Sequence, residues 1–256
     1  MTPRSVWNGT FTFGMVNVPV KLYSAAESKT ISFHEVHARD GARIEHRRIC
    51  PKENEEISID DVVKGYEVDE GKYVVLDKDE IKAAAGDRGK IVYLTEFVDA
   101  NSIDPVFFEK TYYVGSREDK DPYRLVFEAL RKTGRAGIGR FTFHDREYLV
   151  AVRALDDVLA LHTLRFHDEV VDAGDLDLGK AGKRPSPREA GMARKLVDSL
   201  AEDFDPGAYE DTYRAAVLEL IKRKAKGEEI DLAAQEQPEH GDDLAAALEA
   251  SVSGAS

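Results

Sequence analysis

The sequence predicts a mainly β fold with some helix, in which a barrel-like core comes first and a helical region follows. Runs rich in Val, Ile, Tyr and Phe recur from about residue 4 to about residue 166. Strong helix-capping signals concentrate after residue 185. Hydrophobic residues make up 42% of the 256-residue chain, which is enough for a substantial core. This many strands fit a barrel better than a parallel α/β sheet.

The first two strands are predicted on either side of Gly14. Trp7, Phe11 and Phe13 alternate with polar residues, so they share one face of a strand. After Gly14 the apolar positions change parity, which requires a kink, a bulge or a turn at that glycine. Pro19 in the second run predicts an edge position or a bulge. The second apolar set is Val16, Val18, Val20 and Leu22.

Later runs complete the predicted core. Further strands are expected over 73–76, 90–98, 106–114 and 158–166, with a hairpin that turns near residues 144–147 between Phe141 and Val150. A short helix should follow Asp77 and end near Gly86. Asp121 and Pro122 are typical of a helix start, so a second helix is expected through Arg131, with Gly134 as its stop.

A polar linker over residues 172–185 should separate the core, residues 1–171, from a helical region over 186–230. Ser186 and Glu189 form a capping box around Pro187, which predicts a helix start. Asp205 and Pro206 predict the start of the last helix, and Gly227 its end. The apolar positions of that last helix are Tyr209, Tyr213, Val217 and Leu220. Residues 231–256 are acidic and expected to be disordered.

Charge is distributed unevenly along the chain. The net charge is −13, but residues 1–50 and residues 131–165 each carry +3. Phosphate binding depends on local potential, so two positive segments are compatible with nucleic acid despite an acidic total. One cysteine, Cys50, excludes an intramolecular disulfide and fits a reducing compartment. No apolar run is long enough to span a bilayer, and no signal region is evident, so we expect a cytoplasmic protein without a membrane partner.

Four sequence blocks, in order, resemble the bacterial Ku family. The first block is W-x-G-x-x-x-F-G-x-x-x-x-P-V-x-L-Y over residues 7–23. The second spans 63–76, with V-K-G-Y-E and K-Y-V-V-L. The third is K-T-G-R-A-G-I-G-R-F over 132–141, and the fourth is Y-E-D-T-Y over 209–213 with residues 224–227.

The resemblance implies a Ku-type β-barrel core with a protruding bridge arm, about residues 35–72, and a helical C-terminal region. It also implies a homodimeric ring that binds double-stranded DNA ends without sequence preference in non-homologous end joining, at the nucleoid. The implied partner is the multidomain ATP-dependent DNA ligase D, recruited through Tyr209, Tyr213, Val217 and Leu220. A compact chain of this length has a radius of gyration of about 18 Å, so a ring around a duplex needs arms and a second copy.

Basic residues supply the predicted DNA contacts, because guanidinium groups bind phosphate oxygens in a fixed fork. One cluster lies in the implied arm and another follows the second predicted helix. For any one of them the alternative is a solvated basic face. The candidates are Lys21, Arg39, Arg43, Arg47, Arg48, Lys52, Arg131, Lys132, Arg135 and Arg140.

Other functions find less support in the sequence. A monomeric β-barrel that binds RNA or single strands would stack bases on Phe141, Phe143 and Tyr148, although core packing also explains these aromatics. A hydrolase is disfavoured because neither a nucleophile elbow nor a phosphate-binding loop is present. We expect no enzyme activity and no cofactor. In some family members the resemblance implies a C-x-x-C pair at the position of Cys50, which could bind zinc. Glu53 stands at the second position here, so we expect a free thiol and no zinc site. The Lys-rich tail of many family members is replaced by an acidic one.

Overall fold

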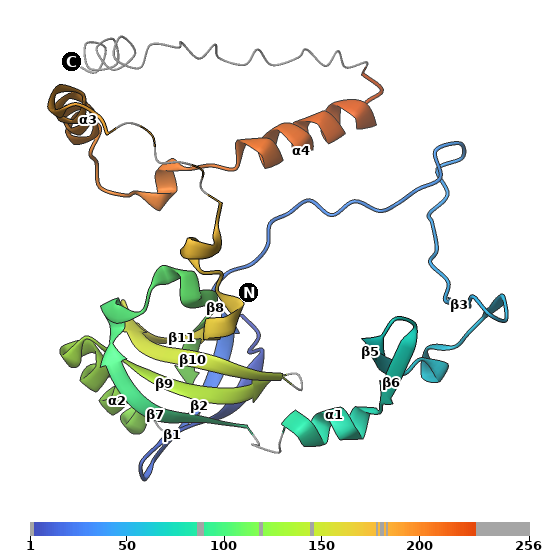
Figure 1. Cartoon of the computed structure of the whole chain (residues 1–256), viewed down its shortest axis with the longest axis horizontal. Helices are drawn as coiled ribbons and strands as arrows, with labels where there is room; N and C mark the ends of the chain where they lie inside the picture. Colours follow the sequence, from blue (N-terminus) through green and yellow to red (C-terminus); the bar gives the residue numbers. More distant parts are fainter. Residues whose placement is uncertain are drawn as a thin grey trace. The chain divides into compact units, whose positions relative to one another are not determined.

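The computed structural model describes residues 3–85, 90–117, 120–143, 146–177, 179, 182 and 184–228 (Figure 1). Contacts divide the chain into two units, residues 1–29 with 33–175, and residues 30–32 with 176–256. Seven strands of the first unit form a closed barrel, as the sequence predicts. The predicted tail, residues 231–256, lies outside the described residues.

The barrel strands follow the order β1-β2-β8-β11-β10-β9-β7. All neighbours are antiparallel except β1 and β7, which close the barrel as a parallel pair. Closure removes the free edges that an open sheet would leave. The strands are β1 (Trp7–Phe13), β2 (Val16–Ser24), β7 (Ile91–Asp99), β8 (Phe108–Ser116), β9 (Arg135–Phe143), β10 (Arg146–Leu155) and β11 (Val158–Leu164).

Alternate residues of these strands fill the barrel interior. Phe11, Val20 and Leu161 are almost completely buried, and Trp7 meets the Phe141 ring edge-on at 5.6 Å between centroids. Gly139 is required where β9 passes β7, because a Cβ there would collide with the Tyr93 carbonyl. The alternation that the sequence shows is therefore the inward and outward alternation of a packed barrel.

The first hairpin resolves the parity change at Gly14. Gly14 has a φ of +55° and forms a two-residue turn with Met15, and Phe13 pairs with Val16 across it. The predicted edge position of Pro19 is wrong for the strand, because β2 has neighbours on both sides. Pro19 is tolerated because the pairing of β2 with β8 starts only at Val20, so no ladder bond needs its missing N–H.

One helix, α2 (Lys120–Thr133), packs on the barrel against β2, β9 and β10. Its Val126, Phe127 and Leu130 join the barrel's buried cluster. The Tyr123 hydroxyl donates to the Val114 carbonyl at 2.7 Å and accepts from the Leu159 amide at 2.9 Å, which ties the helix to β8 and β11. The helix ends before Gly134, whose φ is +63°, as predicted.

A second, smaller cluster lies on the outer face of β9, β10 and β11. The 3₁₀ turns η2 (Ala100–Ser102) and η3 (Pro105–Phe107) cover this face. Ala136, Ala151 and Leu164 are buried under it, and Arg165 holds the covering segment by donating to the Val106 and Phe108 carbonyls at 2.7 Å. The outer face of these strands is thus apolar where the turns cover it.

Residues 33–76, called the arm below, contain only short two-stranded pieces and one turn, and they include the segment of about residues 35–72 for which the family resemblance implies a bridge arm. The elements are β3 (Ile49–Cys50) with β4 (Glu55–Glu56), the turn η1 (Ile59–Asp61), and β5 (Lys64–Asp69) with β6 (Lys72–Leu76). Helix α1 (Lys78–Ala85) follows, as predicted, although its expected end at Gly86 lies outside the described residues. Every residue of β5 and β6 is exposed.

Of the two C-terminal helices, the first begins where the sequence predicts and the second begins later than predicted. Helix α3 (Pro187–Ser199) begins with the predicted capping box of Ser186 and Glu189. Asp205 and Pro206 open only the 3₁₀ turn η6 (Pro206–Ala208), because a new cap, Asp211, starts α4 (Thr212–Ala225). The remaining turns are η4 (His167–Glu169) and η5 (Ala173–Asp175). No helix of the described residues is long and apolar enough to cross a membrane.

Candidate nucleic-acid interface

The basic cluster of the arm is built by short backbone turns. The His37 and Ala42 backbones pair, and Gly41 at φ +71° closes the turn that carries Arg39. Asp40 accepts from the Ala42 amide and contacts His37, and both contacts hold the pKa of this carboxyl below its usual value. All five predicted arm residues, Arg39, Arg43, Arg47, Arg48 and Lys52, are exposed.

These five cations are not equivalent. Arg47 donates to Glu56 at 3.1 Å, and Arg43 and Arg47 line a hollow of about 730 Å³ that also holds Glu45 and Glu56. Arg47 is therefore charge-paired, whereas Arg43 shares the hollow with these carboxylates but forms no ion pair among the described residues. Among the described residues, no carboxylate forms an ion pair with the other three, which are Arg39, Arg48 and Lys52. Together with Arg43, these three are the predicted arm cations that no carboxylate of the described residues pairs with.

The predicted residues of the barrel do not form one patch. Lys21 lies on β2 opposite Asn8 and Gly115, on the outward-facing side. Arg140 also faces outward from β9, where it pairs with Glu147 at 3.0 Å. Five residues of strand, about 16 Å, separate Arg140 from Arg135. The structure therefore does not support treating Arg140 as part of the group formed by the other three basic residues.

Arg131 and Arg135 come together at the end of α2. Both line a cleft of about 200 Å³ between that helix and the barrel, and the exposed Lys132 lies beside them in sequence. Arg131 pairs with Glu128 at 3.2 Å, and Arg135 donates to the Phe97 carbonyl at 3.1 Å. A third arginine, Arg153 of β10, lines the same cleft. Sequence reasoning missed it because Arg153 belongs to a different strand, and only the packing of α2 against β10 brings it to Arg131.

The aromatic residues that a single-strand binder would need take part in the packing of the barrel. Phe141 is buried in the barrel, and Phe143 and Tyr148 pack against the same cluster. The Phe141 and Phe143 rings are stacked at 5.8 Å between centroids. Core packing, one of the two interpretations that the sequence left open, therefore accounts for the position of these aromatics.

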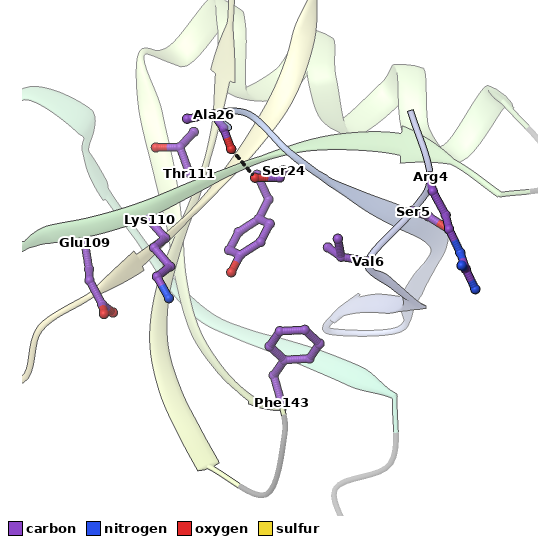
Figure 2. Close-up of a pocket in the computed structure, with 10 residues that line it drawn as sticks. Arg4, Ser5, Val6, Ser24, Ala26, Glu109, Lys110, Thr111 and Phe143 are labelled. Carbon is purple, nitrogen blue, oxygen red and sulfur yellow. Dashed lines mark hydrogen bonds between the residues drawn. The ribbon is translucent and has the colours of Figure 1, made fainter. Parts of the chain in front are cut away.

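A larger cleft, of about 870 Å³, opens where β2 ends and β8 begins. Figure 2 shows Val6, Lys110 and Phe143 around it, with Arg4 and Ser5 contributed by the N-terminal segment. The Ser24 hydroxyl donates to the Ala26 carbonyl at 2.6 Å along its rim. None of the basic residues predicted for DNA lines this cleft.

The predicted partner-binding residues are exposed to different degrees. Tyr213 is strongly exposed on α4, and Val217 and Leu220 are half-buried on the same face of that helix. Tyr209 is not on the helix, contrary to the prediction, because α4 begins at Thr212. Tyr209 instead stacks on Phe204 at 5.7 Å between centroids, and both rings are largely exposed.

Metal ligands do not gather in the part of the chain that the structure describes. No group of three His, Cys, Asp or Glu side chains there is placed to hold a metal ion. Cys50 is a half-buried free thiol at the end of β3.

Comparison with known proteins agrees with this architecture. The family model described as the Ku70/Ku80 beta-barrel domain matches residues 12–192, most of the chain. The chain belongs to the Ku family. The match covers six of the seven barrel strands in full and the end of β1, and it includes the arm.

Curated bacterial members of the Ku family are similar over nearly the whole chain. A protein named Non-homologous end joining protein Ku, from Anaeromyxobacter sp. (strain K), is 44% identical over 235 residues, which is 91% of this chain and 79% of that protein. Non-homologous end joining protein Ku 1 of Saccharopolyspora erythraea is 40% identical over 98% of this chain and 78% of its own length. The Ku protein of Mycobacterium tuberculosis is 36% identical over 97% of this chain and 94% of its own length.

Proposed function

We propose that this chain forms a homodimeric ring that binds double-stranded DNA ends without sequence preference. The ring would recruit and stimulate the ATP-dependent DNA ligase D in non-homologous end joining at the nucleoid. The proposal combines family membership with one observation, the unburied apolar surface of the arm. It assigns the chain a binding role and no catalytic step.

The apolar side chains of the arm support a second copy as partner. Tyr66, Tyr73 and Val75 expose 69%, 58% and 57% of their surface. Exposed apolar patches mark interaction surfaces, and an isolated two-stranded hairpin is only marginally stable in water. A twofold axis lets the same patch of two identical chains cover each other, which closes a ring.

The charge of the arm supports a contact to backbone phosphates. Arg39, Arg48 and Lys52 are exposed cations without a carboxylate partner among the described residues. Contacts to phosphate fix the position of a protein on DNA but carry no sequence information. A local positive surface can bind DNA although the whole chain carries −13, because the potential at the phosphate decides affinity.

The division of the chain into a core over 1–171, a linker over 172–185 and a helical region over 186–230 assigns recruitment to the last part. Phe204, Tyr209 and Tyr213 each expose more than two thirds of their surface. Glu202, Asp203, Glu210 and Asp211 surround these rings, and like charge disfavours DNA there. An apolar and aromatic face with an acidic border fits a protein partner.

A truncation separates these roles. A chain that ends after Arg184 should retain dimerisation and DNA-end binding and lose stimulation of the ligase. Normal stimulation by a folded truncated dimer would assign recruitment to the barrel. Loss of the dimer itself would mean that the helices cover the core instead.

End dependence tests the ring. The protein should bind linear duplex and leave relaxed, covalently closed circles unbound in a competition assay at moderate salt. Ligating the DNA into a circle after loading should trap the protein in a complex that survives high salt. Equal affinity for linear and closed circular duplex would exclude the ring.

A further inference from the structure

The cleft at the end of α2 concentrates positive charge from three separate elements. Arg131 comes from α2, Arg135 from the start of β9 and Arg153 from β10. Asn101 adds a neutral polar side chain, and Asp156 is the carboxylate that lines the cleft with them. Glu128 pairs with Arg131 from outside the lining, so Arg135 and Arg153 against Asp156 leave this small cleft with an excess of positive charge.

Arg153 is held in place without a carboxylate. Its Nε–H donates to Nε2 of His162 at 3.0 Å, and its guanidinium carbon lies 5.9 Å from the centroid of the Phe108 ring. Within the described residues, no hydrogen bond or ion pair occupies its two terminal nitrogens. Arg153 is half-buried, so its charge is screened less by water than that of a fully exposed arginine.

His162 is suited to orient this arginine because it is neutral. Only 5% of its surface is exposed, and burial, followed by the charge of Arg153, lowers its pKa to about 4. Its Nε2 accepts from Arg153, so the ring proton is on Nδ1 and is donated to the Thr111 hydroxyl at 2.9 Å. The Phe108 ring packs edge-on against the imidazole at 5.0 Å between centroids. Both nitrogens and the ring plane are thereby fixed.

We propose that this cleft binds one backbone phosphate of the DNA, with Arg153 as a direct contact and His162 as the residue that positions it. The proposal rests on the proposed DNA binding. An arginine whose Nε is held by a neutral acceptor keeps two terminal N–H groups for a phosphate in fixed geometry. Arg131 and Arg135 border the same phosphate, Arg131 held by Glu128 and the Phe127 ring and Arg135 by the Phe97 carbonyl.

Salt dependence of binding to a linear duplex tests the arginine. Arg153→Gln should weaken binding about tenfold and lower the log-log salt slope by about 1.8, since about 0.9 is lost per phosphate and each substitution enters both protomers of the proposed dimer. Arg124→Gln is the matched control, because Arg124 is an exposed arginine of α2 that does not line the cleft. An equal fall in slope for both variants would overturn the proposal.

Asp156 allows a test that strengthens binding. Asp156 has a φ of +50°, a conformation that asparagine also tolerates, so Asp156→Asn removes the lining carboxylate without new backbone strain. DNA affinity should rise two- to threefold. Asp157→Asn, next along the chain and outside the cleft, should leave affinity unchanged. An equal rise in both variants would show that only the net charge matters and would overturn the proposal, even if Arg153→Gln fails to fold.

A double-mutant cycle tests His162 as a positioning residue. His162→Leu should weaken DNA binding in the natural chain and have no further effect in the Arg153→Gln background, whereas His162→Gln, which keeps an acceptor, should restore binding. Equal effects of His162→Leu in both backgrounds would leave it a purely structural residue and overturn its assignment. A natural chain that does not bind linear duplex would overturn the proposed function as well. Normal end binding with an unchanged Arg153→Gln slope would overturn the cleft alone.

Discussion

The barrel and the arm use the same kinds of apolar residue in opposite ways. In the barrel, Val20 and Leu161 are completely buried because seven strands close around them. In the arm, Val75 and Tyr66 remain more than half exposed, because the β5–β6 hairpin has no second layer among the described residues. The barrel thus has a core of its own, whereas the arm needs a surface from elsewhere. This difference is the physical basis for proposing a second copy of the chain.

The largest expected difference between the two regions is in the free energy of unfolding. Leu161→Ala should destabilise the barrel by about 2–5 kcal/mol, because it leaves a cavity in a packed interior. Val75→Ala, in the exposed arm hairpin, should change the unfolding free energy of the monomer by less than about 0.5 kcal/mol. Denaturant unfolding of dilute, monomeric protein measures both. Similar costs for the two substitutions would show that the arm packs within its own chain.

A second difference concerns acid stability. The folded-state pKa of His162 is about 4, below the ordinary value of 6.5, so the unfolded chain binds a proton that the native barrel does not as pH falls from 6.5 to 4. This contribution is complete above pH 6.5 and is lost as pH falls through that window, at a cost of about 3 kcal/mol. His162→Gln should therefore lose less stability than the natural chain between pH 7 and pH 4.5.

The control for that experiment comes from the arm. His46 is exposed and contacts Glu35 at 3.0 Å, so His46→Gln is the same substitution made at a surface histidine and is measured beside His162→Gln. Denaturant titrations at several pH values give the comparison. If His162→Gln and the natural chain lose stability in parallel, the imidazole of His162 is not the buried neutral acceptor that Arg153 requires.

The smallest expected effect distinguishes the arm's cations from those of α4. Arg48→Gln should weaken DNA binding about tenfold because it removes a phosphate contact. The loss should be the same for DNA of different sequences, since a phosphate contact carries no sequence information. Lys224→Gln removes another exposed charge, from the end of α4, and should have little effect. Affinities at several salt concentrations decide between them. A larger loss for Lys224→Gln would place the DNA path along the helical region.

The barrel could be predicted from sequence because its rules are local. The parity change at Gly14, the alternation in β1 and the glycine that ends α2 each depend on neighbouring residues, and the structure confirms all three. The edge position of Pro19 was predicted wrongly because the order of strands in a barrel cannot be read from neighbouring residues. Only the structure shows that β2 lies between β1 and β8 and that its pairing with β8 starts after the proline, at Val20. The start of α4 was predicted too early because Asp205 and Asp211 are both good helix caps. In the structure Asp205 caps only the turn η6, and Asp211 caps α4.

The candidate site was predictable as a set of residue types and not as an arrangement. Sequence grouped Arg140 with Arg131 and Arg135, but the pleat and length of β9 separate it and give it Glu147 as partner. Arg153 had no sequence signal, because its two contacts, His162 and Phe108, come from other strands. These contacts arise from the pairing of β11 with β10 and with β8, which the sequence alone does not reveal.

The mass of the protein in solution tests the central claim most directly. Light scattering behind size exclusion should give about 57 kDa for the natural chain without DNA, twice the 28.5 kDa of one chain. Tyr66→Asp, which places a charge in the exposed apolar face of the arm, should give 28.5 kDa, and Leu125→Asp, at a matched 67% exposure on α2, should remain a dimer. A natural chain that elutes as a monomer at micromolar concentration, or a Tyr66→Asp variant that stays dimeric while Leu125→Asp dissociates, would contradict the account.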